Sequence, residues 1–249
     1  MEVFNLVRAT IRNNGIRYFI AASFKQAVEY VMLSFFPNYV INNFSKRAEL
    51  VSNRTNDLIK FAFNYRFLCV GIKPDQEVYE IRDFLNLLKK QNPKNIMEIG
   101  TNKGGTLFLF SKISDPEAKI ISVDYQPTRT MQKWFERRVR LYRTFVKKGQ
   151  SLHLIMADSH KQETLKRIKN LLSREKLDFL FIDGDHGYNG VKADYRMYSQ
   201  FVKKGGIIAF HDVSTAPGVI KFWAELKTQI PQAQEINHVN GWGIGIITR

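Results

Sequence analysis

From about residue 93, the chain alternates short apolar runs with longer segments in which apolar residues recur every three or four positions. Short apolar runs predict buried strands, and the longer pattern predicts amphipathic helices. We expect strands at residues 95–99, 119–124, 153–157, 178–182 and 206–210. We expect helices at residues 105–113, 128–147, 162–173, 191–202 and 219–228. This repeated order predicts an α/β fold with a doubly wound parallel sheet.

The carboxy-terminal residues continue the strand pattern. GWGIGIIT, residues 241–248, predicts a last strand, and residues 235–238 predict a partner for it. We expect this pair to complete the sheet in the antiparallel direction.

The amino-terminal segment 18–36 has the length of a membrane span, yet Lys25, Gln26 and Glu29 lie near its middle. A charge at the centre of a span costs about 2.5 to 3.5 kcal/mol. Apolar residues recur at helical spacing at Ile20, Phe24, Val28, Val31 and Phe35. We expect no transmembrane segment and no secretory signal. An amphipathic helix that packs on the core or on a partner subunit is predicted, with peripheral membrane attachment as the alternative.

The composition indicates the cellular compartment and the kinds of partner that the protein could bind. The 249 residues are 44% hydrophobic, enough to bury a full core. Cys69 is the single cysteine, which excludes an intramolecular disulfide and favours the reducing cytoplasm. The net charge of +15 is compatible with nucleic acid, a membrane surface or a phosphorylated substrate. Because the basic residues are scattered along the chain, a solvated basic surface is the favoured interpretation.

Polar residues follow the first predicted strand of the sheet. In MEIGTNKGGT, residues 97–106, Glu98 precedes Gly100, and Gly104 and Gly105 open a helix. The pattern differs from the GxGxxG of dinucleotide-binding loops, so no pyrophosphate cradle is indicated. At the carboxyl end of a parallel strand, Glu98 can meet a cationic amino group while the glycines leave room for the ligand. A tight turn without a ligand is the alternative.

Acidic residues also end the second and third strands. Asp124 can accept both hydroxyls of a ribose, or cap the helix that follows. Asp158 and Ser159 can face an adenine edge, or cap the next helix. Ahead of the first strand, residues 73–76 are expected to form either part of a substrate wall or a turn.

These strand-end motifs resemble the cofactor-binding motifs of class I S-adenosylmethionine-dependent methyltransferases, over about residues 75–249. FIDGDHGYNGVKADYRMY and GGIIAFHDV are similar to the branch containing cephalosporin-hydroxylase-like proteins and metal-dependent O-methyltransferases of macrolide sugars. The resemblance implies a Rossmann-like seven-stranded sheet with an antiparallel last strand, preceded by a variable helical region. The cofactor-binding residues are then expected to be Glu98, Gly100, Thr101, Gly104, Asp124, Asp158, Ser159 and Asp183.

The ends of the fourth and fifth strands indicate a metal site. Asp183 ends one strand, and His211 and Asp212 end its neighbour, so the three side chains can converge. Carboxylate oxygens favour Mg²⁺ or Mn²⁺. The related metal-dependent enzymes have an acidic pair where this chain has His211 and Asp212, and imidazole shifts the preference toward Mn²⁺, Fe²⁺ or Zn²⁺. A metal-free site, in which these side chains hydrogen bond to one another, is the alternative.

His186 matches a proposed general base of the resembling family. An imidazole with a near-neutral pKa can take the proton of an acceptor hydroxyl, with Asp183 as its catalytic partner. Asp185 is expected to orient that imidazole or to contact the cofactor. A helix-entry residue bonded to the backbone is the alternative for His186.

The sequence therefore predicts an S-adenosylmethionine-dependent O-methyltransferase for a small hydroxylated acceptor, such as a sugar or natural product. Residues 1–70 are predicted to be a helical extension that acts as a substrate lid or in homo-oligomerisation, and residues 71–249 to be the catalytic domain. One alternative is a nucleic-acid methyltransferase, although the familiar exocyclic-amine enzymes have Asn-Pro-Pro-aromatic where this chain has Asp-Gly-Asp-His. The other is a non-catalytic protein that keeps the fold for binding or assembly.

Overall fold

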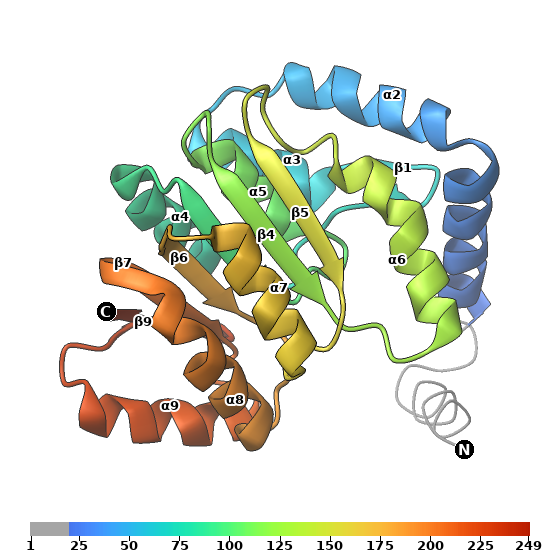
Figure 1. Ribbon diagram of the computed structural model, residues 1–249. Coiled ribbons are helices and arrows are strands. Elements are labelled where there is room, and N and C mark those ends of the chain that lie inside the picture. The colour runs from blue at the N-terminus through green and yellow to red at the C-terminus, as the bar shows by residue number, and fades with distance from the viewer. Residues whose placement is uncertain (1–19) are drawn as a thin grey trace.

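A computed structural model describes residues 20–249 of the chain, as three layers with a central sheet between two layers of helices (Figure 1). The strands of the central sheet are β3 (Asn95–Ile99), β4 (Lys119–Asp124), β5 (Ser151–Met156), β6 (Leu177–Ile182), β7 (Val202–His211), β8 (Gln234–Ile236) and β9 (Ile244–Thr248). Their spatial order is β5-β4-β3-β6-β7-β9-β8. Strands β3 to β7 are parallel, and β9 runs antiparallel to both of its neighbours. The predicted seven-stranded sheet with an antiparallel last strand is confirmed.

Helices cover both faces of this sheet. One face packs against α4 (Val78–Gln91), α5 (Gly105–Ile113) and α6 (Arg129–Tyr142). The other packs against α7 (Gln162–Leu172), α8 (Tyr188–Tyr198) and α9 (Pro217–Gln229). A 3-10 turn, η1 (Ser199–Phe201), joins α8 to β7. The strand order reverses between β3 and β6, and ligands of such sheets bind at this switch point, beyond the carboxyl ends of the strands.

Alternation along each strand explains why the sheet has two separate cores. In β6, Phe179 and Phe181 face the α4–α5 side, while Leu180 and Ile182 face the α7–α9 side. Successive side chains of a strand point to opposite faces, so a continuous apolar run is buried on both. This is why the parallel strands could be located from short apolar runs alone.

Most predicted boundaries are close to the observed ones. Strands β3 and β4 and helix α5 have the predicted limits. Helix α6 ends at Tyr142 rather than at residue 147, because the chain tightens there: Phe145 N donates to Tyr142 O at 3.0 Å and the Phe145 ring is buried. Helix α8 begins three residues earlier than predicted, at Tyr188.

The predicted amino-terminal extension shares the core of the sheet. Helices α2 (Pro37–Glu49) and α3 (Thr55–Asn64) lead to a short hairpin of β1 (Arg66–Phe67) and β2 (Val70–Gly71). Their buried side chains, among them Phe44 and Leu58, belong to the same apolar cluster as α5 and α6. Residues 37–71 are thus packed on the helices that cover one face of the sheet, while a role as lid or oligomerisation region stays a prediction. Residues 1–19 of the predicted extension lie outside the described part of the chain.

Residues 20–35 are helical, as predicted, but the predicted apolar stripe does not pack on the core. Ile20, Phe24, Val31 and Phe35 are 42% to 71% exposed, so the expectation of core packing is wrong for these four residues. The helix contacts the core through its opposite side, where Leu33 is buried. A partner subunit or a membrane surface stays a prediction for the stripe. Within residues 20–249, no helix combines the length and hydropathy needed to cross a membrane.

A buried arginine fastens the helix of residues 20–35 to the rest of the fold. Arg138 of α6 is fully buried and pairs with Glu29 of that helix. Its Nη2 donates to the backbone oxygens of Gly71 at 2.6 Å and Lys103 at 2.9 Å. Its Nε donates to the hydroxyl of Tyr142 at 3.0 Å. Figure 1 shows the helix of residues 20–35 in blue beside α6.

Candidate functional site

Glu98 lies at the carboxyl end of β3 and is almost completely buried. Its Oε1 accepts a hydrogen bond from Ser122 Oγ at 2.8 Å. Its Oε2 has no hydrogen-bond partner within residues 20–249. Burial raises the pKa of Glu98 to about 8. A buried acceptor without a partner is costly unless a donor reaches it, so this oxygen is suited to a ligand amino group.

The glycines after β3 allow close approach between protein segments, which changes their expected role. Gly100 has φ +100°, and a Cβ there would lie 2.0 Å from the carbonyl oxygen of Asp183. A Cβ on Gly104 would meet the ring of Tyr142 at 2.6 Å. A Cβ on Gly105 would meet the backbone of Ile72 at 2.4 Å. The space that glycine provides is therefore filled by the chain itself rather than left for a ligand.

Asp124 lies beside this loop, at the end of β4. Its Oδ2 accepts from Asn102 N at 3.2 Å and from Gln126 Nε2 at 2.8 Å. Burial raises the pKa of Asp124 to about 6. These contacts leave Oδ1 available, as the predicted ribose contact requires. Thr101 is buried beneath the loop, where its hydroxyl meets that of Ser122.

The residues after β5 form a turn ahead of α7, whose N-cap is Lys161, so the alternative expectation that Asp158 or Ser159 caps this helix is wrong. Asp158 Oδ1 accepts from His160 N at 2.9 Å, and Asp158 O accepts from Thr164 Oγ1 at 2.7 Å. Ser159 is buried, and its carbonyl accepts from the hydroxyl of Tyr198. An adenine contact by Asp158 and Ser159 stays a prediction.

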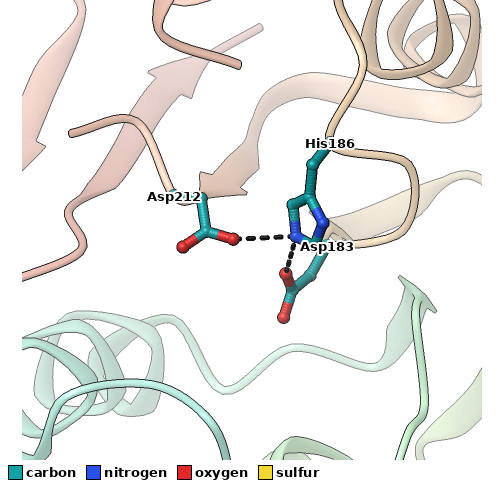
Figure 2. Close-up of side chains that lie close together, drawn as sticks. All are labelled: Asp183, His186 and Asp212. Carbon is teal, nitrogen blue, oxygen red and sulfur yellow. Dashed lines mark ion pairs between the residues drawn. The ribbon is translucent and has the colours of Figure 1, made fainter. Parts of the chain in front are cut away.

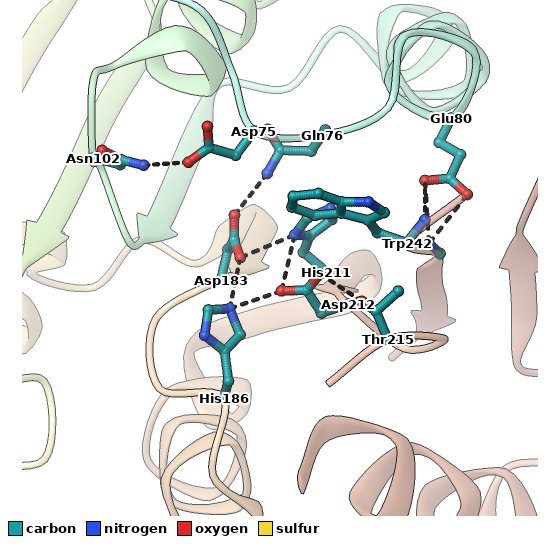
Figure 3. A network of polar contacts seen from close by, with 11 residues as sticks. Asp75, Gln76, Glu80, Asn102, Asp183, His186, His211, Asp212, Thr215 and Trp242 are labelled. Carbon is teal, nitrogen blue, oxygen red and sulfur yellow. Dashed lines mark hydrogen bonds and ion pairs between the residues drawn. The ribbon is translucent and has the colours of Figure 1, made fainter. Parts of the chain in front are cut away.

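Residues 73–76 lie across the glycine loop. Asn102 Nδ2 donates to Asp75, and Gln76 Nε2 donates to Asp183 Oδ2 at 2.7 Å (Figure 3). The segment and the loop enclose a cavity of about 20 Å³, which is room for a single water molecule. The sequence alone was compatible with two interpretations of residues 73–76, part of a substrate wall or a simple turn. The hydrogen bond from Gln76 to Asp183 favours the substrate wall.

Asp183, His186 and Asp212 converge from β6 and β7, as Figure 2 shows. His186 Nε2 lies 2.8 Å from Asp212 Oδ2 and 3.6 Å from Asp183 Oδ1. One potential ligand atom from each residue lies within 4.8 Å of the others. Asp212 has a left-handed backbone, φ +63°, and its Oδ1 accepts from Thr215 Oγ1 at 3.0 Å. The turn after β7 thus directs the Asp212 carboxylate back toward β6.

His211, the third ligand expected from the sequence, lies behind this group. Its ring is 3% exposed, and Nδ1 lies 3.1 Å from Asp183 Oδ1 and 3.4 Å from Asp212 Oδ2. His211 and His186 thus both contact the two carboxylates, and the predicted role of His211 as a metal ligand stays a prediction. The sequence did not predict that His186 also lies within ligand distance of Asp183 and Asp212.

The carboxylates keep both histidines protonated at neutral pH. Hydrogen bonds to Asp183 and Asp212 raise the pKa of His186 to about 10. Burial acts to lower the pKa of His211, but bonds to the same two carboxylates outweigh it and raise the pKa to about 10. A general base must be neutral when the proton is transferred. His186 therefore meets this condition only when another cation engages the two carboxylates.

Asp185, expected to orient His186 or to contact the cofactor, stabilises a local turn, and the cofactor contact stays a prediction. Its Oδ1 accepts from Gly187 N at 2.7 Å, and a Cβ on Gly190 would lie 2.2 Å from its carboxylate.

Two further residues near the site were not predicted from the sequence. Glu80 and Trp242 border the cluster in Figure 3, and only long-range contacts bring them there.

Comparisons with known proteins found a family model and two relatives that match part of the chain. Residues 97–213 match a family model described as a methyltransferase domain. An uncharacterized protein, R132 of Acanthamoeba polyphaga mimivirus, is 53% identical over 14% of this chain and 16% of its own. The uncharacterized protein y4gI of Sinorhizobium fredii is 26% identical over 65% of this chain and 18% of its own. The chain thus spans less than a fifth of the length of these curated relatives.

Solved structures share the fold. The O-methyltransferase of Bacillus cereus has a TM-score of 0.52 at 18% identity and covers 90% of this chain and 97% of its own. TomG of Streptomyces achromogenes, an O-methyltransferase of tomaymycin synthesis, has a TM-score of 0.52 at 17% identity over 84% and 94%. CalS11, a TDP-rhamnose 3'-O-methyltransferase of calicheamicin biosynthesis, has a TM-score of 0.50 at 15% identity over 91% and 93%. Residues 97–213, which carry the strand-end carboxylates, thus match a methyltransferase-domain model, and the chain has the fold of these solved structures.

Proposed function

We propose that the protein is an S-adenosylmethionine-dependent O-methyltransferase that acts on a small hydroxylated acceptor with the help of a divalent cation. One observation carries the proposal. The carboxylates of Glu98 and Asp124, at the ends of β3 and β4, lie beside the Asp183–His186–Asp212 cluster at the ends of β6 and β7. A methyl donor held by the first pair would lie next to a hydroxyl held by the second group.

The residues of the first pair suit the cofactor. The partnerless oxygen of Glu98 suits an ammonium group, and the available oxygen of Asp124 suits ribose hydroxyls. When bound, S-adenosylmethionine supplies a methyl group that is already activated on a sulfonium. Residues 73–76 lie across the glycine loop, and we expect them to move when the cofactor binds. The bonds that must break are those from Asn102 to Asp75 and from Gln76 to Asp183.

The cluster suits a divalent cation. Asp183 and Asp212 would hold it through hard carboxylate oxygens, with His186 as a nitrogen donor or as a neighbouring acid or base. A cation there would make an acceptor hydroxyl more acidic. It would also occupy the carboxylates that now keep His186 protonated, which frees the imidazole to accept the hydroxyl proton.

Two observations favour a small hydroxylated molecule as the methyl acceptor. The Asp183–His186–Asp212 cluster is rich in carboxylate oxygens, and the structural neighbours have names that describe such substrates. CalS11 and TomG are described as enzymes of natural-product synthesis, and the first acts on a nucleotide sugar. These names support a sugar or natural product as the acceptor class. The cytoplasm is the compartment that we propose for such chemistry, because the single cysteine favours a reducing environment.

The test uses purified protein, S-adenosylmethionine labelled at the methyl group, and a panel of hydroxylated acceptors, with chelator or with added Mg²⁺ or Mn²⁺. We expect labelled product that disappears with chelator and returns with the metal. His186→Ala is expected to abolish transfer while S-adenosylhomocysteine binds unchanged. Transfer that is insensitive to chelator would refute the role of the cation, and normal turnover in His186→Ala would remove it as the base.

Nucleic acid is included in the same panel as the competing acceptor, because the chain carries a net charge of +15. Transfer to RNA or DNA alone, falling steeply as salt is added, would replace the small-molecule proposal. No binding of cofactor at millimolar concentration would favour a non-catalytic protein over both enzymes.

A further inference from the structure

We propose that Trp242 is the platform on which the ring of the acceptor stacks, and that Glu80 exists to hold it there. The inference rests on the proposed function and adds the shape of the acceptor: a ring with hydroxyls on its edge. Trp242 follows β8 in the loop that leads to β9. Figure 3 shows its indole beside His211 and the Asp183–His186–Asp212 cluster, with Glu80 on the other side of its backbone.

The carboxylate of Glu80 is fully buried and serves the loop alone. It accepts backbone hydrogen bonds from His238 N at 3.2 Å, Trp242 N at 3.1 Å and Gly243 N at 3.1 Å. Burying a carboxylate is expensive, and three N–H donors are the kind of compensation that makes it tolerable. A fully buried acid on α4 thus fixes a loop that is 158 to 163 residues away along the chain.

Glycines and a second backbone bond complete the support of this loop. A Cβ on Gly241 would lie 1.9 Å from Glu80 Oε1, so only glycine lets the backbone reach the carboxylate. Gly243 has φ +81°, and a Cβ there would lie 2.5 Å from Ser214 Oγ. The carbonyl of Trp242 accepts from Ser214 N at 2.9 Å. Trp242 is therefore fixed on both sides of its backbone.

The side chain held in this way is a large exposed aromatic. Trp242 is 38% exposed, and its ring lies 5.7 Å from the ring of His211 at an interplanar angle of 37°. An exposed indole whose backbone is fixed in this way offers a flat apolar face to a ligand ring. Through His211, the indole adjoins both carboxylates of the cluster, since Nδ1 of His211 contacts each of them.

The surroundings of the indole define the chemistry of its ligand. The polar groups beside it in Figure 3 are the carboxylates of Asp183 and Asp212 and the amide of Gln76. A cation held by the two carboxylates would bind hydroxyl oxygens of a ligand there. An apolar flat face next to several hydroxyl-binding groups matches a ring that has C–H or π faces and hydroxyls on its edge. Pyranose sugars and catechols both have this chemistry.

Fluorine NMR tests the proposal directly on the full chain labelled with 5-fluorotryptophan. The chain has three tryptophans, so the Trp242 signal is the one absent from the Trp242→Phe spectrum. We expect that signal to shift saturably on titration with methyl α-L-rhamnopyranoside, with catechol, or with both, and the two arms distinguish a sugar from an aromatic ring. The signals of Trp134 and Trp223 are expected to stay in place.

Affinity of the same two probes, measured by calorimetry, separates a platform from a mere neighbour. Trp242→Ala is expected to weaken binding about tenfold, and Trp242→Phe to retain most of it, because the aromatic face is kept. Val239→Ala is the matched control: this residue is in the same loop, is 94% exposed, and should bind as the unmodified protein does. Glu80→Gln, which places an amide N–H against the loop donors, should weaken binding as Trp242→Ala does.

A saturable shift of Trp242 with an unchanged affinity in Trp242→Ala would overturn the proposal, and so would the absence of any shift with either ring. If Glu80→Gln does not fold, the Trp242 and Val239 variants decide by themselves. Failure of the proposed function has a different signature, which is no binding of S-adenosylhomocysteine by the unmodified protein. The ring titrations are run with and without that compound and report on Trp242 in either case.

Discussion

Replacing Arg138 with methionine removes a cation that is fully buried and bonded on every side. The guanidinium pairs with Glu29, donates to the carbonyls of Gly71 and Lys103, and contacts the hydroxyl of Tyr142. Methionine keeps much of the apolar stem but leaves the Glu29 carboxylate and two carbonyls without their donor. Removing one partner of a buried ion pair costs about 3 to 5 kcal/mol. For a chain of this length, that cost lowers the melting temperature by roughly 6 to 20 °C.

Urea unfolding followed by circular dichroism measures this loss, with thermal unfolding as a second readout. Arg140→Met is the matched control, because Arg140 is an exposed residue of the same helix whose Nη2 donates to Asn38 Oδ1 at 2.7 Å. Exposed contacts of this kind contribute about 0 to 1 kcal/mol. Equal losses of unfolding free energy in the two variants, or a loss below about 1 kcal/mol in Arg138→Met, would refute the reasoning.

Two further predictions concern the glycine loop. Because burial raises the pKa of Glu98 to about 8, its carboxyl is neutral at pH 7, and binding an ammonium must release the proton. Affinity for S-adenosylhomocysteine should therefore rise between pH 6 and 8, by up to about tenfold per unit. An equal slope in Glu98→Gln, measured by calorimetry, would contradict this. Gly100→Ala should cost at least about 2 kcal/mol more in urea unfolding than Gly205→Ala, since both have positive φ but only the first Cβ meets backbone. Equal losses of unfolding free energy in the two variants would show that the backbone at Asp183 moves away from the new Cβ without a penalty.

The fold was predictable from the sequence because local patterns of apolar residues determine where its strands and helices lie. Buried parallel strands need continuous apolar runs, and the sequence places such runs in β3, β4 and β6 at regular intervals. The carboxyl ends of parallel strands share one edge of the sheet, so Glu98, Asp124 and Asp183 could be brought together without knowing any distance.

Other features depend on contacts that local patterns do not contain. Periodicity identified a helix at residues 20–35, but its apolar stripe does not face the core, because Leu33 and the Glu29–Arg138 pair anchor the opposite side. His186 joins the two aspartates beside His211, because the loop after β6 brings its imidazole back toward Asp183 and Asp212. Glu80 and Trp242 meet across 162 residues, and no spacing rule connects them.

Calorimetric titration with S-adenosylhomocysteine tests the central claim, that the carboxylates at the ends of β3 and β4 bind the cofactor. We predict saturable binding to the unmodified protein. Asp124→Asn should weaken it by roughly 10- to 100-fold, the value of a hydrogen bond to a charged group. Glu175→Gln, which alters the ion pair with Lys119 at the opposite end of β4, should leave it unchanged. No binding at millimolar concentration, or equal affinity in Asp124→Asn and the unmodified protein, would contradict the account.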